Sequence, residues 1–180
     1  FCNSGMKKAL ILTGKLVQDH EFIYPYYRVQ EEGFSVTVAA EDGKETQGQL
    51  GIKIPVNAKI DDINPDEYDL LIIPGGAKCL EYLRQNKQAL QIISDWNKKE
   101  KIIGAICHGS QMLISAKVVK GRKISGYYSI KDDIENAGAI YVDEPAVRDK
   151  NIITTAHYKH LGDWMKEIFK TYYEKYDRIN

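Results

Sequence analysis

The sequence predicts one α/β domain with a mainly parallel central sheet and helices on both faces. Short apolar runs such as Leu70–Ile73 have the length of buried strands, and they alternate along the chain with longer amphipathic stretches. These runs are continuously apolar, as in parallel sheets that are covered on both sides. The 180 residues suffice for one such domain with a sizeable core, which we assign to residues 6–180.

The first half of the chain predicts three strands and one helix. A first buried strand at Ala9–Leu12 precedes a helix from Asp19 to Glu32, and Gly33 then occupies the position that favours a helix end. Further strands are expected at 34–40 and 68–73, with a hairpin or excursion at 44–56.

The second half continues the alternation of helices and strands. A long helix is expected over Glu81–Glu100, with an inward stripe of Leu83, Leu90, Ile93 and Trp96. The remaining expected elements are a strand at 102–106, a helix at 109–116, a short strand at 124–127, a helix at 130–137, extended segments at 139–142 and 151–155, and a closing helix at 161–176.

Charge and cysteine content exclude several classes of protein. Lys and Arg together number 25, as do Asp and Glu, so the net charge of zero argues against a nucleic-acid or anionic-membrane binder. No apolar run is long enough to span a bilayer. The three cysteines are too few for a disulfide framework, so we expect a reducing, cytoplasmic setting. We expect no cofactor and no metal, because the four histidines lack a recognised ligand spacing with cysteine.

The start of the chain has two interpretations. Met6 precedes a clean strand pattern, so we interpret residues 1–5 as a cloning remnant. The rival interpretation is a matured export product with Cys2 near its end, although no apolar signal segment is visible.

A cysteine between a strand and a helix is the strongest chemical signal. In Gly104–Gly109, small residues would let the backbone turn sharply at Cys107. A thiol at a helix N-terminus is favoured as the thiolate, and backbone N–H groups there can hold an oxyanion. The alternative is a buried cysteine that packs as a small apolar side chain.

Two further loops are expected at the same edge of the sheet. Pro74-Gly75-Gly76 follows a strand expected beside that of Cys107, and the N–H groups of Gly76 and His108 are our candidate oxyanion pair. A plain turn is the alternative. Glu21 lies in the first turn of a helix that contains Pro25, whose ring could kink the helix and turn Glu21 inward. A surface glutamate is the alternative there.

Three segments together resemble one known family. Asp19–Pro25, Leu71–Gly76 and Gly104–Gly109 are similar to the PfpI/ThiJ superfamily, which is allied to the class I glutamine amidotransferases, and residues 131–138 resemble its PfpI protease/amidase branch. The resemblance extends over nearly all of residues 6–176. It implies a flavodoxin-like three-layer sandwich and assembly into homodimers or larger homo-oligomers.

The resemblance also implies roles for individual residues. Cys107 would be the nucleophile, Glu21 would contact its thiol, and His108 would belong to the catalytic triad. The third member would come from a neighbouring subunit and corresponds to Glu81. Tyr127 would lie near the pocket.

The late loop departs from the family pattern, because Ala156 and Tyr158 occupy the positions of an Arg and a Pro. Amidotransferases place their catalytic histidine in this loop, so His157 is an alternative base for Cys107. A loop histidine that is exposed or caps the closing helix is the other interpretation. Cys79 is either a resolving thiol for an oxidised Cys107 or a free, partly buried thiol.

Three functions stay open from the sequence. The first is a cysteine-dependent enzyme that acts on a carbonyl or amide group of a small molecule or peptide, as a peptidase/amidase or in glyoxalase/deglycase-type chemistry. The second is a redox-sensing stress protein in which Cys107 is oxidised without turnover, and the third is a binding module. In the first, a protonated Glu21 would donate a hydrogen bond to the Cys107 thiolate, because two adjacent anions repel.

Overall fold

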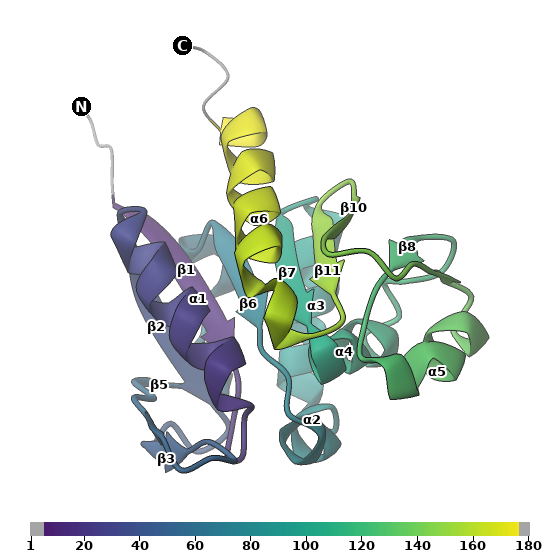
Figure 1. The fold of residues 1–180 in the computed structure, drawn as a ribbon. Helices are drawn as coiled ribbons and strands as arrows, with labels where there is room; N and C mark the ends of the chain where they lie inside the picture. Colours follow the sequence, from purple (N-terminus) through teal and green to yellow (C-terminus); the bar gives the residue numbers. More distant parts are fainter. Residues whose placement is uncertain (1–5, 177–180) are drawn as a thin grey trace.

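The computed structural model describes residues 6–176, so the interpretation of residues 1–5 lies outside the described residues. It confirms the predicted fold class (Figure 1). A seven-stranded sheet has the order β10-β11-β7-β6-β1-β2-β5, and all neighbouring strands are parallel except the β10–β11 pair. The strand order reverses between β1 and β6, and in open α/β sheets that point opens the crevice in which ligands bind.

Most strands lie where the apolar runs predicted them. The strands of the main sheet are β1 (Lys7–Leu12), β2 (Phe34–Ala40), β5 (Ala58–Lys59), β6 (Leu70–Ile73), β7 (Ile102–Ile106), β10 (Val147–Asp149) and β11 (Ile152–Thr155). The hairpin expected within 44–56 is confirmed as the antiparallel pair β3 (Thr46–Gln47) and β4 (Lys53–Ile54). A second small pair, β8 (Lys123–Ile124) and β9 (Ile140–Tyr141), is parallel.

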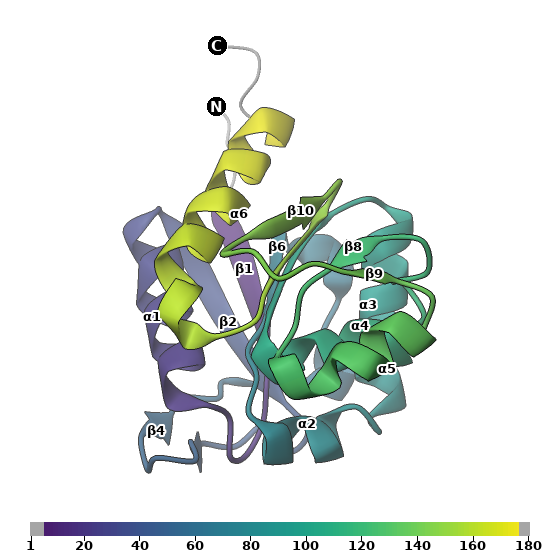
Figure 2. The ribbon, with the colours of Figure 1, turned by 45° about the vertical axis from the view of Figure 1, so that its right-hand side comes forward.

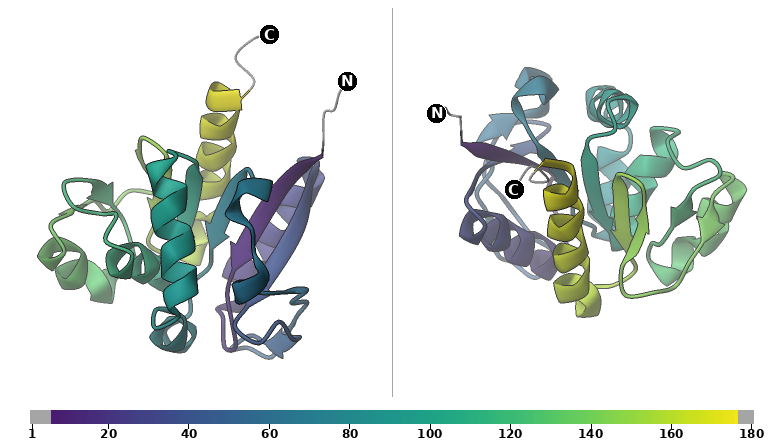
Figure 3. Two further views of the ribbon diagram at one scale, coloured as in Figure 1. Left: turned by 180° about the vertical axis from the view of Figure 1, so that it is seen from behind. Right: turned by 90° about the horizontal axis from the view of Figure 1, so that it is seen from above.

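The helices form two layers around the sheet. They are α1 (Asp19–Glu31), α2 (Ala77–Leu83), α3 (Lys87–Lys98), α4 (Ser110–Ser115), α5 (Lys131–Asn136) and α6 (Leu161–Tyr176), with 3₁₀ turns at 60–62, 65–67, 107–109, 128–130 and 158–160. Helices α1 and α6 run side by side over one face, and α3 covers the other (Figure 3). Helix α5 lies with β8 and β9 in an excursion on the β11 side (Figure 2). Within residues 6–176, no helix is both long and apolar enough to cross a membrane.

The expectation of one helix over Glu81–Glu100 is wrong. Two helices, α2 and α3, occupy this region, and α2 begins before it at Ala77. Asn86 separates them, because its side chain accepts the Ala89 N–H at 2.9 Å and so caps the start of α3. The apolar periodicity continues across the break between α2 and α3. The inward stripe of apolar residues therefore did not reveal that break.

Two buried tryptophans fix the outer helices to the sheet. The indole N–H of Trp96 on α3 donates to the Ile102 carbonyl at 2.9 Å, and that of Trp164 on α6 donates to the Ile153 carbonyl at 3.0 Å. Both rings are buried with their polar atoms satisfied, as a packed core requires. The helices therefore clamp β7 and β11 from opposite faces, and β7 leads directly to Cys107.

Gly104 on β7 has no room for a side chain. A Cβ atom there would lie 2.5 Å from Ile168 Cδ1 and 3.1 Å from Trp164 Cζ2 on α6. We predict that Gly104→Ala lowers the free energy of unfolding by about 1–3 kcal/mol through overpacking. Ile168→Val removes the clashing methyl group and alone costs about 0.5–1.5 kcal/mol. Urea denaturation should show the double variant less destabilised than the sum of the single variants. Simple additivity would contradict this packing account.

Candidate active site

Cys107 lies on a sharp turn between β7 and α4. Its φ angle is 60°, in the left-handed region that residues with a side chain rarely adopt. Two contacts hold this turn in place. In the first, Tyr127 donates its backbone N–H to the Cys107 carbonyl at 3.1 Å. A Cβ on Gly109 would lie only 2.4 Å from the Ile73 carbonyl oxygen, so α4 starts tightly against the end of β6. This is the strand-to-helix turn that Gly104–Gly109 predicted.

The thiol side chain meets two backbone donors. The N–H groups of Gly76 and His108 form hydrogen bonds to the Cys107 sulfur, and both lower the pKa of the thiol. Gly76 has a φ angle of 104°, which a residue with a side chain could not adopt without strain. The two N–H groups proposed as the oxyanion pair therefore converge on the Cys107 sulfur.

Glu21 lies in the interior beside this sulfur. Its side chain has no exposed surface, and Oε1 accepts the Gly75 N–H at 2.9 Å. The Gln18 side chain caps α1 by accepting the Glu21 N–H at 3.0 Å. This cap fixes the backbone position of Glu21 in the first turn of the helix. The carboxyl interacts with the Cys107 side chain. Within residues 6–176, Oε2 is buried without a hydrogen-bond partner.

Burial decides the protonation of the Glu21–Cys107 pair. Burial raises the pKa of Glu21 to about 8 in spite of the Gly75 N–H, so the carboxyl is protonated at neutral pH. Burial also raises the pKa of Cys107, and negative charge on Glu21 raises it further, against the two backbone donors. The backbone donors at the helix start therefore do not outweigh burial. Below about pH 8, however, the repulsion from Glu21 is absent.

His108 is placed to accept the proton of the thiol. Its Nδ1 lies 3.5 Å from the Cys107 sulfur. Burial lowers the pKa of His108, so its ring is neutral at pH 7 and one nitrogen is free to accept a proton. The Tyr127 ring stacks on the imidazole with centroids 4.9 Å apart, which holds the ring in place.

His157 does not contact the thiol. It stacks near Tyr127, with centroids 6.4 Å apart, so Tyr127 contacts both His157 and His108. Its Nδ1 accepts the Lys159 N–H at 3.1 Å and caps the turn before α6. This geometry corresponds to the capping interpretation.

Two further candidates lie away from the sulfur within this chain. The Glu81 side chain is exposed on α2 and forms an ion pair with Lys78 at 2.7 Å. Cys79 is buried, with its Sγ 4.0 Å from Thr13 Oγ1, and burial raises its pKa to about 11. Unlike Cys107, Cys79 has no histidine hydrogen-bonded to its sulfur among the described residues, so it lacks a base for its proton and is a poor resolving nucleophile.

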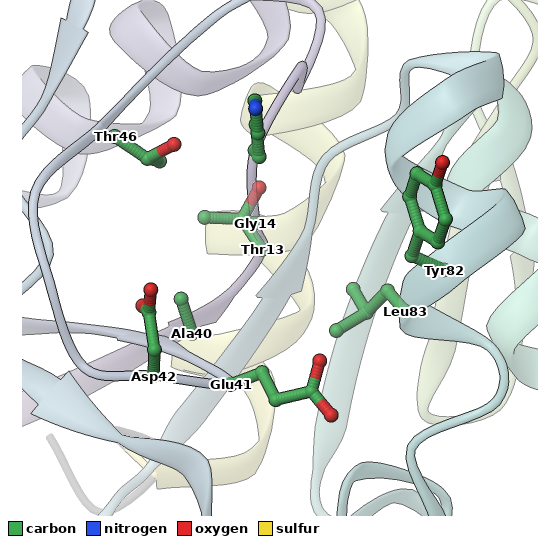
Figure 4. A pocket seen from close by; sticks show the side chains of 9 residues that line it. Thr13, Gly14, Ala40, Glu41, Asp42, Thr46, Tyr82 and Leu83 are labelled. Atoms are coloured by element: carbon green, nitrogen blue, oxygen red, sulfur yellow. The ribbon is translucent and has the colours of Figure 1, made fainter.

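A cleft of about 410 Å³ lies between the ends of β1 and β2 and helix α2 (Figure 4). Tyr82 and Leu83 form one side, and Thr13, Ala40 and Glu41 are among the residues on the other. Neither Cys107 nor Glu21 lines it. The thiol and this cleft are therefore separate features of the same sheet edge.

Sequence reasoning missed two residues of the site. Gly75 supplies the N–H that orients Glu21, and Gln18 caps the helix that carries it. Both lay beside residues that were singled out, in Pro74-Gly75-Gly76 and just before Asp19. A polar side chain before a helix start is a usable capping signal, but the approach of Gly75 to Glu21 depends on the tertiary fold.

Comparison with known proteins gives a consistent family. The model of the DJ-1/PfpI family matches residues 7–171. Deglycase PfpI of Pyrococcus furiosus is 40% identical over 91% of this chain and 98% of its own length. General stress protein 18 of Bacillus subtilis is 39% identical over 84% of this chain and 88% of its own.

A solved structure agrees. A two-domain protein of Anabaena variabilis, with DJ-1/ThiJ/PfpI-like and ferritin-like domains, superposes with a TM-score of 0.88 at 30% identity. The match covers 91% of this chain and 47% of that one.

Gly75 provides a test of the geometry around Glu21. A Cβ at this position would lie 2.5 Å from Glu21 Oε1 and 2.9 Å from the Ile106 carbonyl oxygen. We predict that Gly75→Ala lowers the free energy of unfolding by at least about 1–3 kcal/mol, because the backbone on the far side cannot move away. The control is Gly162→Ala, where an added Cβ meets nothing within 4 Å and helix propensity favours alanine by up to about 1 kcal/mol. Equal stability of the two variants in urea would rule out the tight approach.

Proposed function

This chain belongs to the DJ-1/PfpI family, and on that basis we propose that it is a deglycase whose nucleophile is Cys107. Curated relatives named deglycases confirm the expectation of an enzyme at the level of this broad class. One observation carries the proposal: the N–H groups of Gly76 and His108, the Glu21 carboxyl and the His108 imidazole all meet at one sulfur. A cysteine that served only packing would not need four polar partners.

The first covalent step follows from this arrangement. The Cys107 sulfur attacks a carbonyl carbon of the substrate, its proton passes to Nδ1 of His108, and the electron pair of the C=O bond moves onto the oxygen. That oxygen then takes the hydrogen bonds of the Gly76 and His108 N–H groups, which the sulfur accepts in the free protein. The step is common to attack on a sugar- or dicarbonyl-derived adduct and to attack on an amide.

Glu21 controls the charge of the site. Because it is protonated at neutral pH, it can donate a hydrogen bond to the sulfur as the sulfur loses its proton. The pair then carries one negative charge rather than two. His108 is better placed than His157 to receive the thiol proton, since His108 is the histidine in contact with the sulfur.

Assembly and location complete the proposal. Glu81 is exposed, which leaves its carboxylate available to a neighbouring subunit, so we propose that it reaches the site of a partner in a homodimer or larger oligomer. Both cysteines of residues 6–176 are free thiols, in keeping with the proposed cytoplasmic location.

A redox-sensing role is the second candidate. The carboxyl beside Cys107 could donate a hydrogen bond to an oxidised sulfur, and the name of General stress protein 18 points to stress physiology. The two candidates differ in what the protein does without an oxidant. A sensor leaves an adduct intact, whereas a deglycase releases the amine.

The test is release of N-acetylarginine from its methylglyoxal adduct, followed by chromatography with a trap present for free methylglyoxal. We expect wild-type protein to release N-acetylarginine faster than spontaneous reversal, and Cys107→Ser to abolish the excess rate. His108→Gln should lower kcat/KM by about 10²–10⁴-fold, the usual contribution of a general base. His157→Gln is the matched control and should stay within about twofold.

Three results would count against this proposal. If wild-type protein with the trap released N-acetylarginine no faster than the trap does without protein, deglycase activity would be excluded. Activity that survives Cys107→Ser would exclude the nucleophile. Equal losses in the two histidine variants would remove His108 as the base.

A further inference from the structure

A basic hollow of about 510 Å³ lies between α1 and α6, which run side by side on one face of the sheet (Figures 1 and 3). Three of the residues that line it are cationic and one is acidic. They are Tyr24, Arg28, Lys159, Gly162, Asp163 and Lys166. In a chain of zero net charge, this is a local positive excess.

The positive charge in the hollow is only partly neutralised. Arg28 forms an ion pair with Glu32 at 2.7 Å and lies over the Phe169 ring. Among the described residues, Lys159 and Lys166 have no carboxylate within ion-pair distance, and Asp163 pairs with neither. The Lys159 ammonium group lies over the Tyr128 ring, 5.8 Å from its centroid, and an aromatic ring does not neutralise its charge. The charges of both ammonium groups are therefore not balanced by a carboxylate. Gly162 leaves the hollow open, because a side chain there would meet nothing within 4 Å.

Helix α1 carries residues of both the hollow and the candidate active site. His20, Tyr24 and Arg28 are spaced four residues apart, so they lie on one face of the helix, and His20 adjoins Glu21. The His20 ring stacks on Tyr158 with centroids 4.6 Å apart, and Lys159 comes next in the chain. One to two helical turns, roughly 5–10 Å along the axis, separate the level of Glu21 from those of Tyr24 and Arg28.

The same rings lead to the thiol from the other side. The Tyr158 ring also contacts that of His157 in a tilted arrangement, His157 lies near Tyr127, and Tyr127 stacks on His108. A row of rings therefore runs from beside Cys107 to the edge of the hollow. Tyr158 stands where the family pattern has a proline, so this row is a feature of this chain.

We propose that the hollow binds the phosphate group of a phosphorylated substrate whose reactive carbon reaches Cys107. This inference deepens the proposed function and rests on it. A phosphate monoester is close to a dianion at pH 7 and offers three acceptor oxygens, which suits two ammonium groups without a carboxylate partner and a guanidinium group. Adducts of phosphorylated sugars or amines carry both groups, a phosphate monoester and a reactive carbon, in one small molecule.

Binding is tested first, without turnover. Inorganic phosphate is titrated into ¹⁵N-labelled protein at low ionic strength, and the amide resonances of Gly162 and its neighbours are followed. We expect saturable shifts there. Lys159→Gln and Lys166→Gln should each weaken binding about two- to fivefold, the usual effect of one exposed charge. Asp163→Asn should strengthen binding by a similar factor, because Asp163 is the one carboxylate among the described residues that line the hollow. Lys170→Gln, an exposed lysine on the same helix that does not line the hollow, is the control and should change nothing.

The sign of the Asp163→Asn effect separates a binding site from a merely structural cluster. The proposed phosphate site would be overturned if the amide resonances near Gly162 showed no saturable shift. It would also be overturned if Lys170→Gln weakened phosphate binding as much as Lys166→Gln.

Substrate use is tested second, with methylglyoxal adducts of O-phosphoethanolamine and ethanolamine. We expect a higher kcat/KM for the phosphorylated adduct, and Lys166→Gln should reduce this preference by the same two- to fivefold. Phosphate binding with equal turnover of both adducts would overturn the assignment to substrate. Phosphate binding with turnover of neither adduct would contradict the proposed function and leave the anion site standing.

Discussion

Two acidic groups, the carboxyl of Glu21 and the thiol of Cys107, lie in contact in the interior at the carboxyl edge of the sheet. Burial makes charge on either group costly, and charge on one makes charge on the other costlier still. At neutral pH the pair therefore holds both of its protons. Removal of one leaves a single proton shared by two groups that titrate as a unit rather than independently. The chemistry proposed for this chain depends on where that proton resides when the sulfur attacks.

The fold explains how such a costly pair is held. Cys107 takes a strained backbone conformation because β7 is clamped by Trp96 and Trp164 from opposite faces and α4 starts against β6. Glu21 is held by the Gln18 cap and the Gly75 N–H. Strain and burial of this kind persist only where the surroundings over-determine them, and such places are where functional sites gather.

The sequence predicted the architecture better than the electrostatics. The residues around Val36 and Val38 located β2, a continuous apolar run located β7, and the amphipathic closing helix matched α6 at both ends. β5 was missed because a strand of two residues leaves no apolar run, and the break at Asn86 was hidden by an uninterrupted apolar stripe. The turn at Cys107 was foreseen from its small neighbours. The direction of its pKa shift was not, because burial of a side chain is a property of the whole fold and not of the local motif.

The most direct test of this account is the rate at which iodoacetamide labels Cys107 between pH 6 and pH 10, followed by mass spectrometry of its peptide in wild type and Glu21→Gln. Burial raises the pKa of Glu21 from 4.5 to about 8, so its charge is absent below that pH and present above it. The account predicts similar labelling rates near pH 6.5 and a wild-type rate that falls behind above pH 8, by roughly tenfold for each unit by which the carboxylate raises the pKa of the thiol. Parallel profiles across the whole range, or faster labelling of wild type above pH 8, would contradict it.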